Sequence, residues 1–299
     1  MTERAVGLIG LGLMGGAIGR NLVERGWRVI GCDIDAARRQ EATEAGIAIA
    51  DSAAVVAAQA PVIMTSLPSA AAAHAIAAEI GASPSPRIVV ELSTFAIADK
   101  LRFKDLLDRG GHIALDCPLS GTGAQAITRD LVVYASGDAA AIARCAGLFA
   151  DFARQSADLG AYGNGSRMKF IANHLVAIHN VAAAEAMLLA ERAGLDARQV
   201  VELVGPGAGG SRMFQLRAPM MAARRYEPPT MRVATWSKDM AIIAAFADEL
   251  GCATPLFAAT APIYAEALAL GLGAQDTACV FEVLKARGKA DSSKTSDTT

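Results

Sequence analysis

Short apolar runs separated by longer amphipathic stretches mark the first half of the chain. Runs rich in Val, Ile and Leu are typical of buried strands, and the stretches between them carry a helical period. The predicted strands are residues 5–9, 28–32, 60–66, 87–92, 112–116 and 130–135; one helix ends near residue 25 and others cover 35–45, 69–80 and 97–109. Strands that alternate with helices predict an α/β fold with a doubly wound parallel sheet.

From Gly163 onward the pattern is helical, with hardly a strand signal. The predicted helices are residues 166–192, 196–204, 211–222, 236–250, 256–271 and 275–287. A chain of 299 residues is long enough for two domains. We predict an α/β domain over residues 1–162, an all-α domain over residues 163–288, and a polar, disordered tail at 289–299, which is too poor in apolar residues to fold.

A glycine-rich turn joins the first predicted strand to the first predicted helix, with the spacing G-x-G-x-x-G. The first glycine permits the tight turn, the second lets the backbone approach a pyrophosphate, and the third lets the helix pack against the strand. The N–H groups that begin the helix attract phosphate. The predicted contacts with the cofactor are Gly10, Gly12, Leu13, Met14 and Gly15. This pattern predicts a Rossmann domain over residues 1–162.

Asp33 ends the second predicted strand, about 20 residues beyond the glycines, where a carboxylate binds the adenosine ribose. It favours NAD, because it would repel the 2′-phosphate of NADP. Arg38 and Arg39 follow closely enough to offset that repulsion, although a solvated helix face is their simpler interpretation, so NADP stays open. The order strand, glycine turn, helix, strand and acid argues against a signal peptide at residues 5–19.

The composition narrows the classes of partner. Lys and Arg number 28 against 30 for Asp and Glu, without a long basic run, which argues against nucleic acid or an anionic membrane. No apolar run is long enough to span a bilayer. The five cysteines are scattered and the four histidines form no ligand pair. We therefore predict reduced thiols, no metal site and a cytoplasmic location.

Lys169 lies just inside the predicted start of the long helix after Gly163. The positive end of the helix dipole and the apolar neighbours Met168, Phe170 and Ile171 disfavour its charged form, so its pKa is expected to fall toward the working pH. A lysine tuned in this way serves as a general acid or base. The alternative is a solvated helix lysine, which is the ordinary setting of this residue type.

Asn173 and Asn180 share a helix face with Lys169, together with Val176 and Ala184. If that face is buried, its polar groups need hydrogen-bond partners. One interpretation makes both asparagines satisfied core amides. The other places Lys169 and Asn173 on a cleft at the domain boundary, where a nicotinamide would lie.

Four separated motifs resemble those of the β-hydroxyacid dehydrogenase family, which includes 3-hydroxyisobutyrate dehydrogenase, tartronate semialdehyde reductase and L-threonate dehydrogenase. They cover nearly the whole chain except the tail. The motifs are the glycine turn at 7–15, the loop Asp116–Thr122, the helix start from Gly163 through Lys169 and Asn173, and the pair Lys238-Asp239. The segments Leu67-Pro68 and Glu91–Thr94 match family loops that flank the cofactor.

The resemblance implies a role for each matching residue. Lys169 would be the general acid/base, and Asn173 would orient the substrate or a catalytic water. The other implied contacts are Ser120, Gly121, Thr122 and Ser211 for the substrate, and Leu67, Pro68, Thr94 and Lys238 for the cofactor. The resemblance implies an NAD(P)-dependent oxidoreductase that moves a hydride between a small hydroxy acid and the nicotinamide. It also implies a homodimer or homotetramer.

The chain departs from the family pattern where the substrate would bind. Thr122 replaces the second glycine of the D-x-P-x-S-G-G loop, and Met231 and Thr235 stand where Phe and Leu are frequent. The segment 209–214 resembles threonate-type members, and its Arg212 either pairs with a second anionic group or lies on a helix surface. The identity of the substrate acid therefore stays open, and sugar acids are among the candidates.

Two other classes remain open. Imine reductases share the architecture but lack the family lysine, and a non-catalytic dinucleotide-binding protein would need no catalytic residue. The combination of Lys169, Asn173, Ser120 and Lys238 argues against both.

Overall fold

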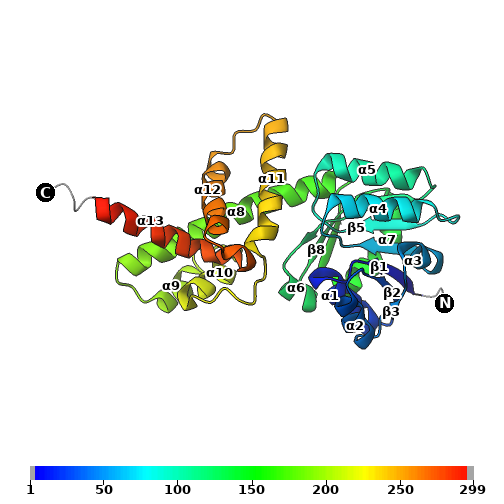
Figure 1. Ribbon diagram of the computed structural model, residues 1–299, viewed down its shortest axis with the longest axis horizontal. Coiled ribbons are helices and arrows are strands. Elements are labelled where there is room, and N and C mark those ends of the chain that lie inside the picture. The colour runs from blue at the N-terminus through cyan, green and yellow to red at the C-terminus, as the bar shows by residue number, and fades with distance from the viewer. Residues whose placement is uncertain (1–3, 295–299) are drawn as a thin grey trace. The chain divides into compact units, whose positions relative to one another are not determined.

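The computed structural model describes residues 4–294 of the chain. The chain forms two compact units, Met1–Lys169 and Phe170–Thr299. One helix, α8 (Asn164–Arg192), contains the boundary between them (Figure 1).

The first unit is built on a nine-stranded sheet within the described residues, in the order β3-β2-β1-β4-β5-β6-β8-β7, with β9 beside β8. The strands are β1 Ala5–Ile9, β2 Arg28–Cys32, β3 Ala48–Ile49, β4 Val62–Thr65, β5 Ile88–Glu91, β6 Ile113–Asp116, β7 Leu119–Ser120, β8 Val132–Gly137 and β9 Gln155–Asp158. Strands β1 to β6 pair in parallel, which confirms the predicted doubly wound α/β sheet. Strand β8 is antiparallel to β6 and β7, an edge arrangement that the apolar pattern did not predict.

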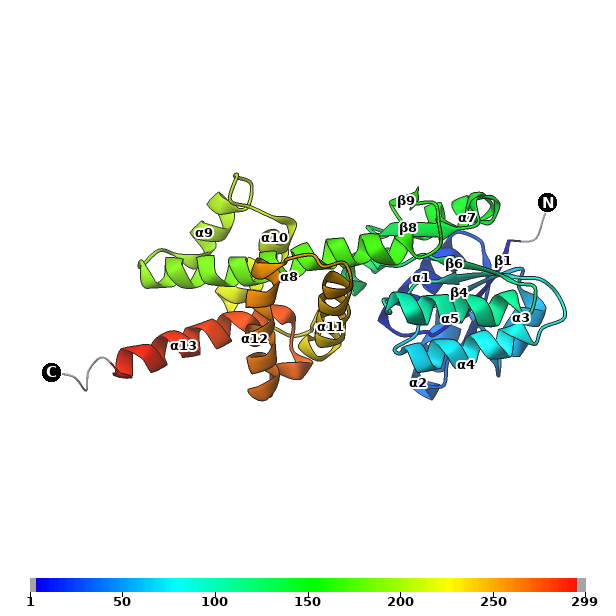
Figure 2. The same cartoon turned by 90° about the horizontal axis from the view of Figure 1, so that it is seen from above.

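Helices cover both faces of this sheet. They are α1 Leu13–Glu24, α2 Ala36–Glu44, α3 Ala53–Gln59, α4 Ala70–Gly81, α5 Ile97–Asp108, α6 Gly123–Ile127 and α7 Ala139–Phe152. The pair α4 and α5 lies on one face and α1 on the other (Figures 1 and 2). Side-chain caps begin several of them: Ser52 accepts from Val55 N, and Ser69 accepts from Ala72 N.

The alternating strand residues feed two separate apolar cores. In β1, Val6 and Leu8 join the core that contains α1 and α7, whereas Ala5 and Ile9 join the core that contains α3, α4 and α5. Successive side chains of a strand point to opposite faces of a sheet, so a strand covered on both faces is apolar throughout. This explains why these strands read as continuous apolar runs.

The second unit is helical. After α8 it contains α9 Ala197–Val204, α10 Arg212–Ala223, α11 Val233–Glu249, α12 Pro255–Ala269 and α13 Val280–Lys294, with the short 3₁₀ segments η1 Leu272–Ala274 and η2 Thr277–Cys279. The buried face of α8 includes Phe170, Asn173, Ala177, Asn180 and Ala184, with the three- and four-residue spacing of a helix stripe.

The end of the chain differs from the sequence prediction. Helix α13 continues to Lys294, beyond the predicted domain end at residue 288 and into the predicted disordered tail of 289–299. No Pro or Gly follows Gly288, so no residue type in this stretch forces the helix to stop. Residues 295–299 lie outside the described residues. Within residues 4–294, every helix is too short or too polar to cross a bilayer.

Candidate active site

In the glycine turn after β1, Gly10 and Gly15 pack against the protein, whereas Gly12 faces open space. Gly10 has φ +91°, and a Cβ on Gly15 would lie 1.9 Å from the Gly10 oxygen, so both positions are closed to side chains. A Cβ on Gly12 would meet nothing within 4 Å. Gly12 is also the N-cap of α1, where no side chain caps the helix. The open space and the first-turn N–H groups of α1 fit a dinucleotide pyrophosphate.

Asp33 follows β2 at the same end of the sheet. Its Oδ2 accepts a hydrogen bond from Leu11 N at 2.6 Å, and its Oδ1 accepts one from Asp35 N at 2.8 Å. Arg39 lies at this corner, where it donates to the backbone oxygens of Asp33 at 2.8 Å and Ile34 at 3.0 Å. The carboxylate is therefore held beside the glycine turn, as an acid that binds a ribose should be.

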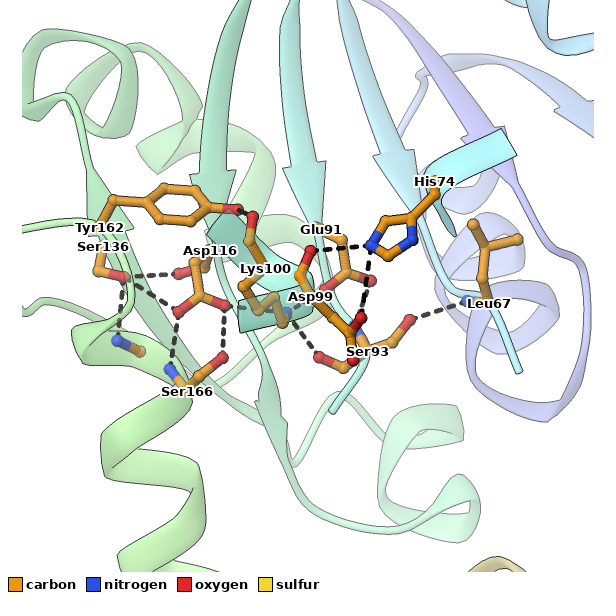
Figure 3. A network of polar contacts seen from close by, with 11 residues as sticks. Leu67, His74, Glu91, Ser93, Asp99, Lys100, Asp116, Ser136, Tyr162 and Ser166 are labelled. Atoms are coloured by element: carbon orange, nitrogen blue, oxygen red, sulfur yellow. Dashed lines mark hydrogen bonds and ion pairs between the residues drawn. The ribbon is translucent and has the colours of Figure 1, made fainter. Parts of the chain in front are cut away.

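The loops after β4 and β5 are joined by a serine (Figure 3). Leu67 N donates to Ser93 Oγ at 2.8 Å, and Ser93 N donates to Glu91 Oε1 at 2.8 Å. Pro68 and Thr94, the other predicted cofactor contacts here, directly follow Leu67 and Ser93 in the chain. The carboxyl ends of parallel strands are where open α/β sheets bind ligands, so these loops lie at the expected edge.

A buried ionic cluster lies beneath these loops (Figure 3). The Lys100 ammonium donates to Glu91 Oε2 and to Ser93 O at 2.7 Å, and it pairs with Asp116 Oδ1 at 2.9 Å. Lys100, Glu91 and Asp116 are fully buried. Burial raises the pKa of Glu91 despite the neighbouring ammonium. Burial alone would lower the pKa of Lys100, but Asp116 and Glu91 outweigh burial and raise it.

The start of α8 is attached to this cluster. Ser166 N donates to Asp116 Oδ2 at 2.8 Å, and Ser166 Oγ donates to Asp116 Oδ1 at 2.8 Å. Gly165 N donates to Ser136 Oγ at 2.9 Å. A Cβ on Gly165 would lie 2.3 Å from Tyr134 O and 2.6 Å from Asp116 O, so only glycine fits. Two strands thus supply the first-turn N–H groups of α8 with acceptors, one turn before Lys169.

The predicted substrate loop follows β6 in the same unit. Ser120 belongs to β7 and pairs with Val132 of β8. Gly121 has φ +136°, and a Cβ there would lie 2.5 Å from the Leu131 side chain. Thr122 forms a capping box with Gln125 at the start of α6, which gives its hydroxyl a structural partner. Thr122, the departure from the family loop, therefore begins a short helix.

The remaining predicted residues lie in the second unit. Asn173 Nδ2 donates to Asp239 Oδ2 at 3.1 Å, and Lys238 Nζ lies 3.3 Å from Asp239 Oδ1, so Asp239 links these two predicted residues. Ser211 is the N-cap of α10, where it accepts from Phe214 N. Asn180 donates to Tyr264 Oη and Thr277 O, each at 2.9 Å, as a core amide would.

The described residues include no disulfide and no cluster of metal ligands. All five cysteines are free thiols. Burial raises the pKa of Cys145 to about 11 and that of Cys279 to about 12, so neither forms a thiolate readily. No group of three or more His, Cys, Asp or Glu side chains within the described part of the chain is arranged to hold a metal ion.

Lys100 is the site residue that sequence reasoning missed. It lies on α5, three residues before the buried Phe103 and seven residues before the buried Leu107, on the same helix face. A lysine on the apolar face of a helix is unusual, since isolated buried charges are costly. Glu91 is the penultimate residue of the predicted strand 87–92, and Asp116 is the last residue of the predicted strand 112–116. These two acids at strand ends were the available signal for the partners of Lys100.

The glycine turn, the acid after β2 and the loops at the carboxyl ends of the strands define the first unit as a dinucleotide-binding domain. Residues 5–162 match the family described as the NAD binding domain of 6-phosphogluconate dehydrogenase. Residues 163–284 match the family described as NAD-binding of NADP-dependent 3-hydroxyisobutyrate dehydrogenase. The chain belongs to the β-hydroxyacid dehydrogenase family, as its motifs predicted.

Individual relatives match over nearly their whole length. Glyoxylate/succinic semialdehyde reductase 1 of Arabidopsis thaliana is 28% identical, over 94% of this chain and 98% of the relative. L-threonate dehydrogenase of Cupriavidus necator is 29% identical, over 97% of this chain and 100% of the relative. The crystal structure of a 3-hydroxyisobutyrate dehydrogenase from Salmonella typhimurium has a TM-score of 0.85 and 28% identity, over 94% of this chain and 100% of that one.

Proposed function

We propose that this protein is an NAD(P)-dependent dehydrogenase of small hydroxy acids, in which Lys169 is the general acid/base. The named relatives act on glyoxylate, succinic semialdehyde and L-threonate, which are small acids with a carbonyl or hydroxyl group. The chemistry common to them is oxidation of an alcohol group in a small carboxylic acid to a carbonyl group, or the reverse reduction. When bound, the nicotinamide accepts or supplies the hydride.

One observation supports Lys169 more than any other. The first turn of α8, which leads directly to Lys169, is fixed by Asp116 and Ser136 at the strand edge that also carries the predicted cofactor and substrate loops. A proton-transfer group must be held within hydrogen-bond reach of the reacting oxygen. In oxidation, Lys169 would take the proton from the substrate hydroxyl; in reduction, its ammonium would donate that proton to the carbonyl oxygen.

The substrate carboxylate is proposed to bind the Ser120 hydroxyl and the Gly121 N–H, with the Thr122 side chain beside it. Gly121 lies at a sharp turn in a segment of small side chains, whereas Thr122 N already donates to Gln125 Oε1 at 3.0 Å. Within the second unit, the proposed contacts are Asn173 and Ser211 for the substrate and Lys238 for the cofactor. Asp239, which accepts from Asn173, would hold that amide in one orientation.

NAD is the proposed cofactor in preference to NADP. The contacts are Gly10, Gly12, Leu13, Met14, Gly15, Leu67, Pro68 and Thr94, with Asp33 on the ribose. Both oxygens of the Asp33 carboxylate are fixed by backbone N–H groups, so the charge cannot turn away from a 2′-phosphate. Arg39 donates to two backbone carbonyls at this corner and would have to leave them to bind a phosphate.

We further propose that the protein works in the cytoplasm as a homodimer or homotetramer. Five free thiols agree with a reducing compartment. Several leucines of the second unit are largely exposed, and a second copy would cover them.

The test is a nicotinamide absorbance assay on a panel of small hydroxy acids and their aldehydes, each with NAD(H) and NADP(H). We expect turnover with at least one acid, a preference for NAD, and a loss of about 100-fold or more in kcat for Lys169→Ala. Lys104→Ala, which removes a lysine that pairs with Asp108 on α5, is the matched control and should keep wild-type kcat.

Three results would contradict this proposal. Turnover of Lys169→Ala equal to that of the control would remove the lysine from the chemistry. Silence on every acid, combined with reduction of cyclic imines, would instead favour the imine reductase alternative, and NADH binding without either activity would favour a non-catalytic protein.

A further inference from the structure

The Lys100 cluster connects three segments that the proposed reaction needs in register. Toward the cofactor loops, Glu91 holds Ser93, and Ser93 holds Leu67. Toward α8, Asp116 holds Ser166 through both carboxylate oxygens. The Lys100 ammonium is the only group that touches both acids within this described network (Figure 3).

Lys100 has no donor to spare. An ammonium has three N–H groups, and those of Lys100 are matched by Glu91 Oε2, Asp116 Oδ1 and the Ser93 carbonyl oxygen. A displacement of any one acceptor would leave a fully buried N–H group without a partner, which costs more than the bond itself contributes. The cluster therefore resists independent movement of the three segments.

The charges of the cluster extend this coupling into α8. Two buried carboxylates face one ammonium, so Asp116 needs a second positive partner. The first turn of α8 supplies it, because Ser166 N and Oγ both donate to Asp116 at the positive end of the helix dipole. Tyr162 adds a further tie just before α8 by donating to the Lys100 carbonyl oxygen at 3.0 Å.

Stability alone is a poor reason for such a cluster. Replacement of a buried ion pair by well-packed apolar side chains is often neutral or stabilising, so charges in a core contribute fixed geometry more reliably than free energy. We propose that Lys100, Glu91, Asp116 and Ser166 are positioning residues that hold the start of α8, and with it Lys169, in register with the cofactor loops. This inference rests on the dehydrogenase activity proposed above.

Two serine variants separate the two sides of the cluster. Ser166→Ala removes one bond to Asp116, while the backbone N–H of residue 166 remains bonded. We expect kcat to fall about 10-fold, with substrate KM and the Kd of NADH within about 2-fold of wild type, because only the alignment of Lys169 changes. Ser93→Ala frees Leu67 N, and we expect the Kd of NADH to rise about 5-fold with kcat nearly unchanged at saturating cofactor.

Ser52→Ala is the matched control. It also removes a serine hydroxyl from the first unit, but one that only caps α3 through Val55 N. All three variants should unfold at similar temperatures. Only Ser166→Ala should lower kcat, and only Ser93→Ala should raise the Kd of NADH. Lys100→Met should show both defects together; if it fails to fold, the serine variants still decide the question.

Hydrogen exchange supplies a readout that needs no turnover. In Ser166→Ala, amide exchange in the first turn of α8, residues 165–169, should rise about 10-fold relative to Ser52→Ala, with the rest of the sheet unchanged. Equal kcat and equal exchange in Ser166→Ala and Ser52→Ala would overturn the inference. If the wild type has no hydroxy-acid activity, the proposed function fails, and exchange in α8 together with NADH affinity in Ser93→Ala still confirms or overturns the positioning role.

Discussion

Gly12 and Gly15 lie three residues apart in one turn, but a side chain is excluded at each for a different reason. At Gly15 a Cβ would collide with the Gly10 oxygen, so this glycine is required by the fold. At Gly12 a Cβ would meet nothing, and the backbone, with φ −65°, is open to any residue. Because the fold does not require glycine at position 12, the space that a bound ligand needs at the start of α1 explains why glycine stands there.

This difference predicts opposite phenotypes for two alanine variants. Gly12→Ala should keep the wild-type unfolding temperature and weaken NADH binding about 10-fold or more, because the new methyl group enters the space of the pyrophosphate. Gly15→Ala should lower the free energy of unfolding by roughly 1–3 kcal/mol, since the backbone must move to admit the methyl group. Thermal unfolding and NADH titration of both variants check this; normal NADH affinity in Gly12→Ala would contradict the assigned cofactor turn.

At the scale of elements, an ion pair in the second unit fixes a loop between helices. Arg217 of α10 donates to Asp276 Oδ1 at 2.9 Å, and both side chains are buried. The other oxygen of Asp276 accepts from Thr230 N, Thr230 Oγ1 and Met231 N, just before α11. Asp276 therefore holds α10 and the segment that leads to Lys238.

Asp276 should make the second unit sensitive to acid. Burial favours the neutral form, but Arg217 and the hydrogen bonds outweigh burial and hold the pKa of Asp276 below its ordinary value. A lowered folded-state pKa gives stability that is present above the unfolded-state pKa of about 4 and is lost as the pH falls through the folded-state pKa. Asp276→Asn should cost roughly 3–5 kcal/mol at pH 7, because Arg217 stays buried without a counterion.

Urea unfolding at pH 7 and at steps below pH 4 measures both effects. The difference between wild type and Asp276→Asn should shrink as the pH falls below about 4. Asp105→Asn, which breaks an exposed pair with Arg109 on α5, is the control and should cost about 0.5 kcal/mol or less. A constant difference across this pH range would show that the carboxylate charge is not what holds the loop.

Most elements with their own apolar period were predicted from the sequence, and elements made by pairing were not. Helices α3 and α7 are exceptions, because the sequence analysis missed them although the buried residues of α7 recur with a helical period. The six predicted strands and the helices after Gly163 carry that period, and the structure contains all of them. Strand β9, Gln155–Asp158, is polar and mostly exposed, and it exists because its backbone pairs with β8. The two-residue strand β7 is likewise too short for any period.

The same distinction applies to the candidate site. The glycine turn and Asp33 could be located because their spacing along the chain is fixed by one strand–turn–helix–strand unit. Lys100 and Ser166 could not, since their partner Asp116 is brought to them by the order of strands in the sheet. Contacts of this kind depend on topology, which local pattern does not contain.

At the scale of the whole molecule, a single chain leaves large apolar side chains in water. Leu189 of α8 is 72% exposed, although α8 buries other apolar residues. Leu203 of α9 is 74% exposed, and no residue of α9 is fully buried. Contiguous apolar patches that stay exposed are characteristic of association surfaces, and we propose that these leucines belong to one. Closed symmetry is the usual outcome when a chain binds its own copies.

The homo-oligomer can be tested through these leucines. Light scattering of the wild type should give two or four times the chain mass of 30.8 kDa. Leu189→Glu combined with Leu203→Glu should shift this toward 30.8 kDa, because a buried carboxylate without a partner opposes association. Leu101→Glu, at a leucine of the first unit that is 51% exposed, is the control and should leave the mass unchanged. A wild-type protein that is monomeric at micromolar concentration would contradict the oligomer, whereas an oligomer that survives the double variant would place its interface on other residues.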